Sequence, residues 1–408
     1  VVIGCDDVGM TVLSFSRFVK KNFVHAPAWS KPEKFIDDLE KQIIKHKPKD
    51  DRPYVLIPVF NETKLIAQYK ERLEQHITVA CPDFAEIDRI DPKDNLARTA
   101  KELNVNIPGT WLPENKDQLE GMIAGEIGFP CFIKPPNEVG GRGVQRLHNA
   151  DELRAAYTEV AKRYDGLPLV QEAVEGDDYC LSVLFQDGEL KASMAYRNLK
   201  KWPKESGAGV VRETVDDTRF ARVAADILGP IGWNGVAEID FLWSGREDED
   251  PYLIEINPRF WAGLDHSVQS AVDFPWLLYE LAAKGEIPEI ARGTVGQRSK
   301  VPVLWFMAAL NEAVSGAENF SALQKAWPEI IKSIKNRRIR EGMKLLGQSL
   351  GKTLSFRDAY QDFRKMYQEG QEAQTTPYAQ HDPMVGLGVL FIVASLIRHG
   401  ELPHEVRR

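Results

Sequence analysis

Two short stretches of this sequence carry oxygen-bearing side chains at every second position. The segment GVAEIDFLW holds Glu238 and Asp240, and PYLIEINPRF holds Glu255 and Asn257, with Arg259 two positions further on. Successive side chains of a β-strand point to opposite faces, so each set should share one face while the intervening apolar residues pack on the other. The sequence therefore predicts two strands, each with a polar face directed at something.

The turn-rich segment SGREDEDP joins these two stretches and predicts an antiparallel hairpin with both polar faces on the same side. Like charges directly opposite each other are destabilising, and a site that keeps them commonly holds cations. Carboxylate and amide oxygens favour Mg²⁺ or Mn²⁺, which also bring nucleotide phosphates into a site. The alternative is a solvated outer face. Arg259 favours the cation site, because a guanidinium there is suited to hold a transferring phosphoryl group.

A lysine and a glycine loop form a second element. The segment CFIKP predicts a strand that ends at Lys134, and the loop GGRG follows with Gly140, Gly141 and Gly143. Backbone N–H groups of neighbouring glycines can approach phosphate oxygens, and a lysine adds a point charge. The G-x-x-x-x-G-K-[ST] spacing of a Walker loop is absent. An ordinary flexible hairpin is the alternative interpretation of this loop.

The segment LVQEAVEGDDY is the third element. It predicts a strand ending at Glu172, followed by Val174 and by two acidic candidates, Glu175 and Asp178. Backbone groups in such a hinge can bind a purine edge, and carboxylates can accept hydrogen bonds from ribose hydroxyls. The alternative is an exposed acidic turn.

Composition limits the class of protein. The chain has 408 residues, 43% hydrophobic and 27% charged, which indicates a folded protein of two to four domains. The net charge of -8 argues against nucleic acid as a partner. The four widely spaced cysteines predict neither a zinc site nor disulfides, and together with the absence of a secretory signal in this numbering they favour the cytoplasm.

The pattern of expected strands and helices changes along the chain. In the first 90 residues, strands at the start and at 52–60 alternate with expected helices at 11–22, 32–47 and 62–75, which predicts a parallel sheet without a dinucleotide fingerprint. From residue 91 the pattern is α+β with many hairpins. Residues 285–300 are interpreted as a linker, and the remainder is expected to be mostly helical.

The order of these elements along the chain resembles that of the ATP-grasp superfamily. The elements are the lysine with its glycine loop, the acidic hinge, and the paired D-x-F-L and E-x-N-x-R motifs. The resemblance covers roughly residues 91–285 and is to the branch of the carbamoyl-phosphate synthase large subunit and biotin carboxylase. It implies an ATP-grasp domain over 91–290, preceded by a Rossmann-like substrate domain over 1–90 and followed by a helical C-terminal region over 291–408.

The resemblance also implies roles for individual residues. The expected nucleotide-binding residues are Lys93 and Lys134 on the phosphates, Gly140, Gly141 and Gly143 in a mobile flap, Glu172 and Val174 at the adenine, and Asp178 or Glu175 at the ribose. The expected metal ligands are Asp240, Glu255 and Asn257, with Glu238 as the alternative first carboxylate. Arg259 and Lys134 are the expected catalytic residues. Pro92 departs from the family, because many relatives have an acidic residue before the basic one.

By this resemblance the chain is expected to be a ligase that uses ATP and Mg²⁺ or Mn²⁺. It would activate a small carboxylate as an acyl phosphate and join it to an amine, releasing ADP and phosphate. A carboxylase, a small-molecule kinase and a non-catalytic ATP-binding module are the alternatives. Lys200, Lys201 and Arg212 follow the next strand and are expected at the surface, with a role in holding a substrate carboxylate as the alternative.

The segment MVGLGVLFIVASLI, at 384–397, has 14 uncharged residues, which is short of the roughly 20 that span a bilayer. We expect it to lie in the C-terminal core or in a homodimer interface. Peripheral contact with an anionic membrane or with a partner protein is the alternative.

Overall fold

The computed structural model describes residues 1–9, 11–136, 143–164, 166–202, 208–287 and 291–300, and a few positions after residue 328. The chain forms two compact units. The first comprises Val1–His25, Lys200–Val211 and Arg298–Arg408, and the second comprises Ala26–Leu199 and Arg212–Gln297. The predicted domain boundaries near residues 90 and 290 remain predictions.

The first unit begins with two parallel strands, β1 (Val2–Asp6) and β2 (Val19–Val24), joined through a 3-10 turn, η1 (Val12–Phe15). The helix predicted over 11–22 is therefore wrong. The second half of that stretch carries β-branched and aromatic residues that fit a strand, and pairing with β1 satisfies its backbone.

Two further short strands belong to the first unit, and one of them corrects the linker prediction. β15 (Arg298–Lys300) pairs in parallel with β16 (Gln374–Thr375). β14 (Ala291–Arg292), in the second unit, pairs with β10 (Glu189–Trp202). Residues 285–300 thus contain strands as well as turns. The segment 384–397 and most of the predicted helical tail lie outside the described residues.

The second unit opens with the predicted alternation of strands and helices. β3 (Val55–Leu56) and β4 (Thr78–Val79) pair in parallel, which confirms this part of the sequence analysis. The helices around them are α1 (Pro32–His46), α2 (Glu62–Gln68), α3 (Lys70–Leu73) and α4 (Phe84–Ile90). Along α1 the buried side chains recur at helical spacing, so one face packs inward.

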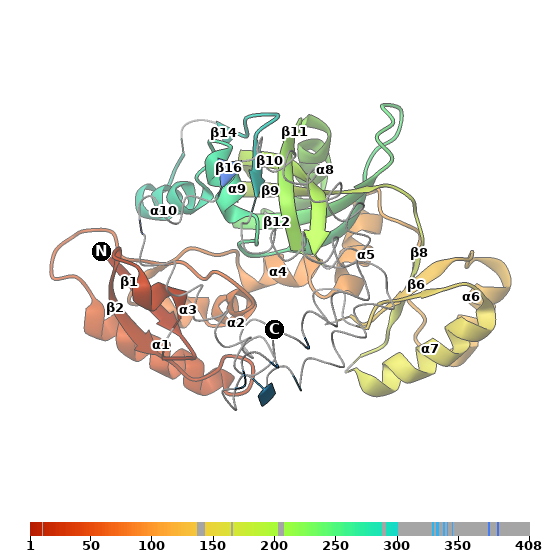
Figure 1. Cartoon of the computed structure of the whole chain (residues 1–408), viewed down its shortest axis with the longest axis horizontal. Helices are drawn as coiled ribbons and strands as arrows, with labels where there is room; N and C mark the ends of the chain where they lie inside the picture. Colours follow the sequence, from red (N-terminus) through yellow and green to blue (C-terminus); the bar gives the residue numbers. More distant parts are fainter. Residues whose placement is uncertain are drawn as a thin grey trace. The chain divides into compact units, whose positions relative to one another are not determined.

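A small antiparallel sheet with its own core follows α5 (Lys93–Glu102). Its strand order is β5-β8-β6-β7, with β5 (Thr110–Trp111), β6 (Cys131–Lys134), β7 (Gln145–Leu147) and β8 (Leu169–Glu172). Two helices pack on this sheet, α6 (Lys116–Gly125) and α7 (Ala150–Arg163), as the yellow part of Figure 1 shows. Their buried faces meet those of β6 and β8 in one apolar cluster.

The larger sheet of the second unit has the strand order β13-β12-β9-β10-β11. The strands not yet introduced are β9 (Asp177–Gln186), β11 (Ala208–Val215), β12 (Gly235–Trp243) and β13 (Tyr252–Asn257). Its helices are α8 (Thr218–Leu228), α9 (Leu264–Gln269) and α10 (Phe274–Lys284). A second apolar cluster, separate from that of the small sheet, joins β9, β10 and β12 to α10. None of the described helices is both long and apolar enough to cross a membrane.

Candidate functional site

The predicted carboxylate hairpin is present, because β12 and β13 pair as neighbouring antiparallel strands. In their register Asp240 is opposite Glu255, and Glu238 is opposite Asn257. Residues directly opposite each other in such a pair project to the same face of the sheet. All four side chains are half-buried, and Asn257 Nδ2 lies 3.5 Å from Asp240 Oδ2. Three carboxylates and one amide therefore share one face.

A β-bulge interrupts this pairing immediately beside the carboxylates. Asp240 pairs with Glu255, but the next residue of β12, Phe241, pairs with Leu253. Ile254 is therefore the extra residue on β13. The sequence analysis predicted the hairpin but not this irregularity.

Burial raises the pKa of two of these carboxyl groups. Burial, together with the charges of Glu238 and Glu255, raises the pKa of Asp240 to about 8. Burial also raises the pKa of Glu238, although the Tyr196 hydroxyl donates a hydrogen bond to Glu238 Oε1 at 2.5 Å. A cation bound on this face would relieve the repulsion.

Two basic side chains reach the same face from outside the hairpin. Lys93, the first residue of α5, places Nζ 2.9 Å from Glu255 Oε1 in an ion pair. Arg259 donates from Nη2 to Asn257 Oδ1 at 3.1 Å, and its guanidinium lies 4.6 Å from the centre of the Phe60 ring. The sequence analysis placed Lys93 and Arg259 in the site. It missed Phe60 and the Lys93–Glu255 pair, because both depend on contacts between segments far apart in the chain.

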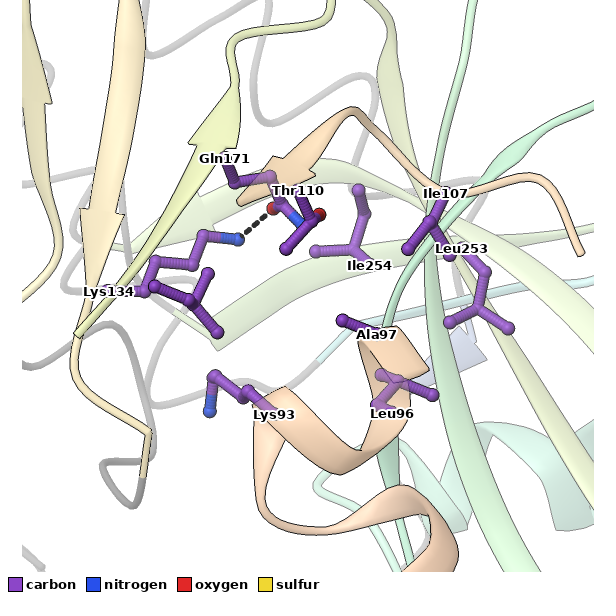
Figure 2. A pocket seen from close by; sticks show the side chains of 10 residues that line it. Lys93, Leu96, Ala97, Ile107, Thr110, Lys134, Gln171, Leu253 and Ile254 are labelled. Atoms are coloured by element: carbon purple, nitrogen blue, oxygen red, sulfur yellow. Dashed lines mark hydrogen bonds between the residues drawn. The ribbon is translucent and has the colours of Figure 1, made fainter. Parts of the chain in front are cut away.

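A small, partly open recess lies next to the carboxylate face (Figure 2). Its lining is mostly apolar, with the polar groups of two lysines, a threonine and a glutamine. The lining residues are Lys93, Leu96, Ala97, Ile107, Thr110, Lys134, Leu169, Gln171, Leu253 and Ile254. An apolar recess with a few polar groups is typical of small-molecule and cofactor sites.

Lys134 stands at the end of β6 and points into this pocket (Figure 2). Its Nζ donates to Gln171 Oε1 at 2.5 Å, and Gln171 in turn donates from Nε2 to Thr110 Oγ1 at 3.0 Å. Burial lowers the pKa of Lys134 to about 8. Gln171 was not predicted, although its place one residue before Glu172 on a strand that crosses the pocket was a usable signal.

The hinge candidates follow β8 as the sequence predicted, but they differ in environment. Glu172 Oε2 accepts a hydrogen bond from the Gly109 N–H at 3.1 Å. Val174 is half-buried, whereas Glu175 and Asp178 are exposed. Of the glycine loop, only Gly143 is described, with a positive φ of 71° that favours glycine. Gly140 and Gly141 lie outside the described residues.

The expectation that Arg212 is a surface residue is wrong. Its side chain is only 4% exposed, on β11. Its guanidinium lies 6.0 Å from the centre of the Tyr196 ring. The sequence pattern missed this because the position follows a turn rich in charge, where basic residues are ordinarily solvated.

The pocket is lined by Lys134 from the small sheet, by Lys93 from α5 and by apolar residues of β13, and it adjoins the carboxylate face of β12 and β13. Comparison with known families identifies the class. Residues 90–263 match the ATP-grasp domain family, so this part of the chain is an ATP-grasp domain and the predicted fold is confirmed.

Among curated proteins, the chain is similar to the C-terminal section of the carbamoyl phosphate synthase large chain of Methanopyrus kandleri. The two sequences are 24% identical over 253 residues, which is 59% of this chain and 46% of the relative. The chain therefore spans about half of that protein's length.

Two solved structures share the fold. One is the biotin carboxylase domain dimer of 2-oxoglutarate carboxylase from Hydrogenobacter thermophilus, in complex with MgADP, ADP and bicarbonate. It has a TM-score of 0.57 and 16% identity, and the match covers 72% of this chain and 67% of that one. The other is the L-amino acid ligase of Bacillus licheniformis, with a TM-score of 0.50, 16% identity, and coverage of 65% and 64%.

Proposed function

We propose that the protein is an ATP-dependent ligase that joins a small carboxylate to an amine. The γ-phosphate of ATP passes to the carboxylate, and the amine then displaces phosphate from the acyl phosphate to form an amide. The observation that carries the proposal is the shared face of β12 and β13, where Asp240, Glu255, Asn257 and Arg259 lie beside a pocket that holds Lys134.

The residues on this face fit a divalent metal ion. Their donors are hard oxygens, as Mg²⁺ and Mn²⁺ require, and the pKa of Asp240 is raised by burial and then by the charges of Glu238 and Glu255, which a cation would offset. In the described part of the chain, no three His, Cys, Asp or Glu side chains are close enough to bind a metal together. We therefore assign two carboxylates and one amide, Asp240, Glu255 and Asn257, as ligands. When bound by these three residues, Mg²⁺ would act as a Lewis acid and offset the negative charge that develops during phosphoryl transfer.

Lys93 has two positions in this proposal. In the structure its ammonium group forms an ion pair with Glu255, and it would turn towards nucleotide phosphates when Glu255 binds the metal. Lys134 contacts the same phosphates, and the loop with Gly143 closes over them to exclude water from the acyl phosphate. Arg259 holds the transferred phosphoryl group, with its guanidinium oriented by Asn257.

We assign the apolar pocket to the adenine. The backbone at Val174 would bind the purine edge, and Glu172 would lie beside it, with its carboxylate already oriented by the Gly109 N–H. The exposed Asp178, or alternatively Glu175, would accept hydrogen bonds from the ribose hydroxyls.

The test is release of ADP that depends on both a carboxylate and an amine, measured over a panel of substrate pairs with a coupled assay. Glu255→Ala and Asn257→Ala should each lower turnover by about 100-fold or more, because each removes several kcal/mol of metal-mediated stabilisation. Asp248→Ala, in the exposed turn of the same hairpin, is the matched control. Full activity in both site variants would refute the metal assignment, and dependence on bicarbonate in place of an amine would indicate a carboxylase.

We also propose that the enzyme works in the reducing cytoplasm, because Cys5, Cys81, Cys131 and Cys180 are all free thiols. Its partners would be the two small substrates and a second copy of the chain. For comparison, the Hydrogenobacter thermophilus biotin carboxylase domain is a dimer.

A further inference from the structure

The face that carries the carboxylates continues across the larger sheet and reaches a buried arginine. On β10 and β11 the neighbouring residues Arg197 and Glu213 form an ion pair. Because side chains alternate along each strand, Tyr196 and Arg212 project to the opposite face, and the Tyr196 hydroxyl there reaches Glu238. Arg212 and the proposed metal ligands therefore share one face.

Arg212 is a buried cation whose charge acts on Glu238. Within the described part of the chain its Nε is buried without a hydrogen-bond partner, and its guanidinium makes no ion pair. Arginine is almost never fully buried unless it is paired, because removing its charge from water is costly. The contact with the Tyr196 ring offsets part of this cost but leaves the buried Nε–H without an acceptor.

A second unsatisfied polar atom lies in the same cluster. The His266 ring packs edge-on against Tyr196, at 5.5 Å between ring centres, and is 1% exposed. His266 Nε2 lies 3.1 Å from Thr214 Oγ1, whereas its buried Nδ1 has no partner among the described residues. Unsatisfied buried polar groups are rare in native proteins, and two around one aromatic ring indicate a site for a polar ligand.

The cluster is distinct from the proposed phosphoryl-transfer centre. The strand order places β11 three strands from β12, or about 14 Å at the usual strand spacing. A tyrosine side chain separates Arg212 from Glu238, whereas Arg259 approaches the carboxylates from the end of β13. The charges of Arg259 and of Arg212 both act on Glu238 and favour its ionised form.

The backbone at Gly263 covers the guanidinium. A Cβ there would be 3.3 Å from Arg212 Nε and 2.8 Å from the Tyr196 hydroxyl oxygen. A small displacement of this loop would make room for a carboxylate on the guanidinium, and a side chain at position 263 would fill that room.

We propose that Arg212 binds a second carboxylate of a substrate, one that does not react. This inference rests on the proposed function and deepens it. One of the two substrates carries an anionic group beyond the reacting centre, as an amino acid or a dicarboxylic acid does, and the fork of the guanidinium holds that group while the other end lies near Arg259.

The experiment measures the rise in melting temperature caused by amino acids and by dicarboxylic acids of three to six carbons, each compared with the amide of one carboxylate. Measurements are made with and without a non-hydrolysable ATP analogue and Mg²⁺. At least one acid should raise the melting temperature of the wild type clearly more than its amide does. Arg212→Met should lose this discrimination, Arg212→Lys should retain part of it, and Gly263→Ala should weaken binding of the acid about tenfold. The exposed Arg222 gives the control, Arg222→Met.

Three results would each overturn the proposal. The acids and their amides could bind equally well, Arg212→Met could bind the acid as the wild type does, or no acid in the panel could bind. In those cases Arg212 serves only to offset the charge of Glu238. The rise in melting temperature caused by the nucleotide analogue alone shows whether each variant is folded. If Arg212→Met does not fold, the discrimination between acid and amide in Arg212→Lys tests the proposal in its place. Binding of an acid that depends on Arg212, without any ATP turnover, would support the carboxylate site and refute the ligase reaction.

Discussion

Replacing Lys134 with methionine is expected to stabilise the protein and, at the same time, to abolish its use of nucleotide. Lys134 is held mostly away from water, and burial lowers its pKa from the usual 10.5 to about 8. Because the folded protein binds this proton less tightly than the unfolded chain does, a charged Lys134 opposes folding. Methionine has a similar length and carries no charge.

The magnitude follows from the two pKa values. Their difference corresponds to roughly 3 kcal/mol at neutral pH, since each pKa unit is about 1.4 kcal/mol. Removing the lysine also leaves Gln171 Oε1 without its donor, which costs about 1 kcal/mol. The variant should therefore be more stable than the wild type by about 2 kcal/mol at pH 7.

The pH dependence gives a signature that a change in packing would not. Below pH 8 Lys134 is protonated in both states and the whole penalty is present. As the pH rises from about 8 towards 10.5, the folded protein loses the proton first, and the wild type becomes more stable. The advantage of the variant should therefore shrink across this interval.

Urea unfolding followed by tryptophan fluorescence at pH 7 and at pH 9.5 measures these differences. Lys41→Met, at an exposed position of α1, is the control and should show neither effect. Adding Mg²⁺ and ATP at about 100 times the dissociation constant should stabilise the wild type alone, by about 2.7 kcal/mol, and so reverse the order of stability. A variant that is less stable at pH 7, or whose advantage does not change with pH, would show that the charge of Lys134 is not the source of the penalty.

Three further changes test the site and its supports. Phe60→Ala should lower kcat/KM two- to fivefold without changing nucleotide affinity, because it removes about 0.5–1 kcal/mol of cation–π interaction with Arg259. Val59→Ala is the control. An unchanged kcat/KM in Phe60→Ala would count against the role of the ring. Gly176→Ala should destabilise the protein by about 1–3 kcal/mol in thermal unfolding, because its Cβ would lie 2.8 Å from the Trp243 backbone N, whereas Gly121→Ala, with nothing near its Cβ, should not destabilise it. Burial, and then the charge of Arg212, lower the pKa of His266 from 6.5 to about 3, so the stability of the protein should fall as the pH drops below 6.5. His266→Gln should remove roughly 3 kcal/mol of the stability lost between pH 7 and pH 4. Identical acid sensitivity in the variant and the wild type would contradict this.

The sequence predicted the hairpin well because period-two patterning is a local signal. Glu238, Asp240, Glu255 and Asn257 alternate with apolar residues, and the connection between their strands is short, so both face and pairing follow. The order of the three motifs similarly predicted the ATP-grasp fold. The strand at 19–24 was mistaken for a helix, because its few apolar residues fit the spacing of a helix as well as that of a strand. Pairing with β1, which local spacing does not encode, makes this segment a strand.

The parts that could not be predicted depend on distance across the fold. Lys93 and Glu255 are 162 residues apart in the chain, and no local pattern pairs them. Arg212 resembles any other basic residue beside a turn until β10 and α9 cover it. The positions of Phe60 and Gln171 likewise follow from packing between segments, which composition and spacing do not encode.

The bulge at Ile254 has a consequence for the architecture of the site. In a regular strand Leu253 and Ile254 would point to opposite faces, yet both line the apolar pocket, while Glu255 lies opposite Asp240. The extra residue thus lets a strand of six residues contribute apolar side chains to the pocket and oxygen atoms to the neighbouring carboxylate face. Removing Ile254 would restore regular pairing with β12 and keep Leu253 and Glu255 on opposite faces, but the pocket would lose one of its apolar lining residues.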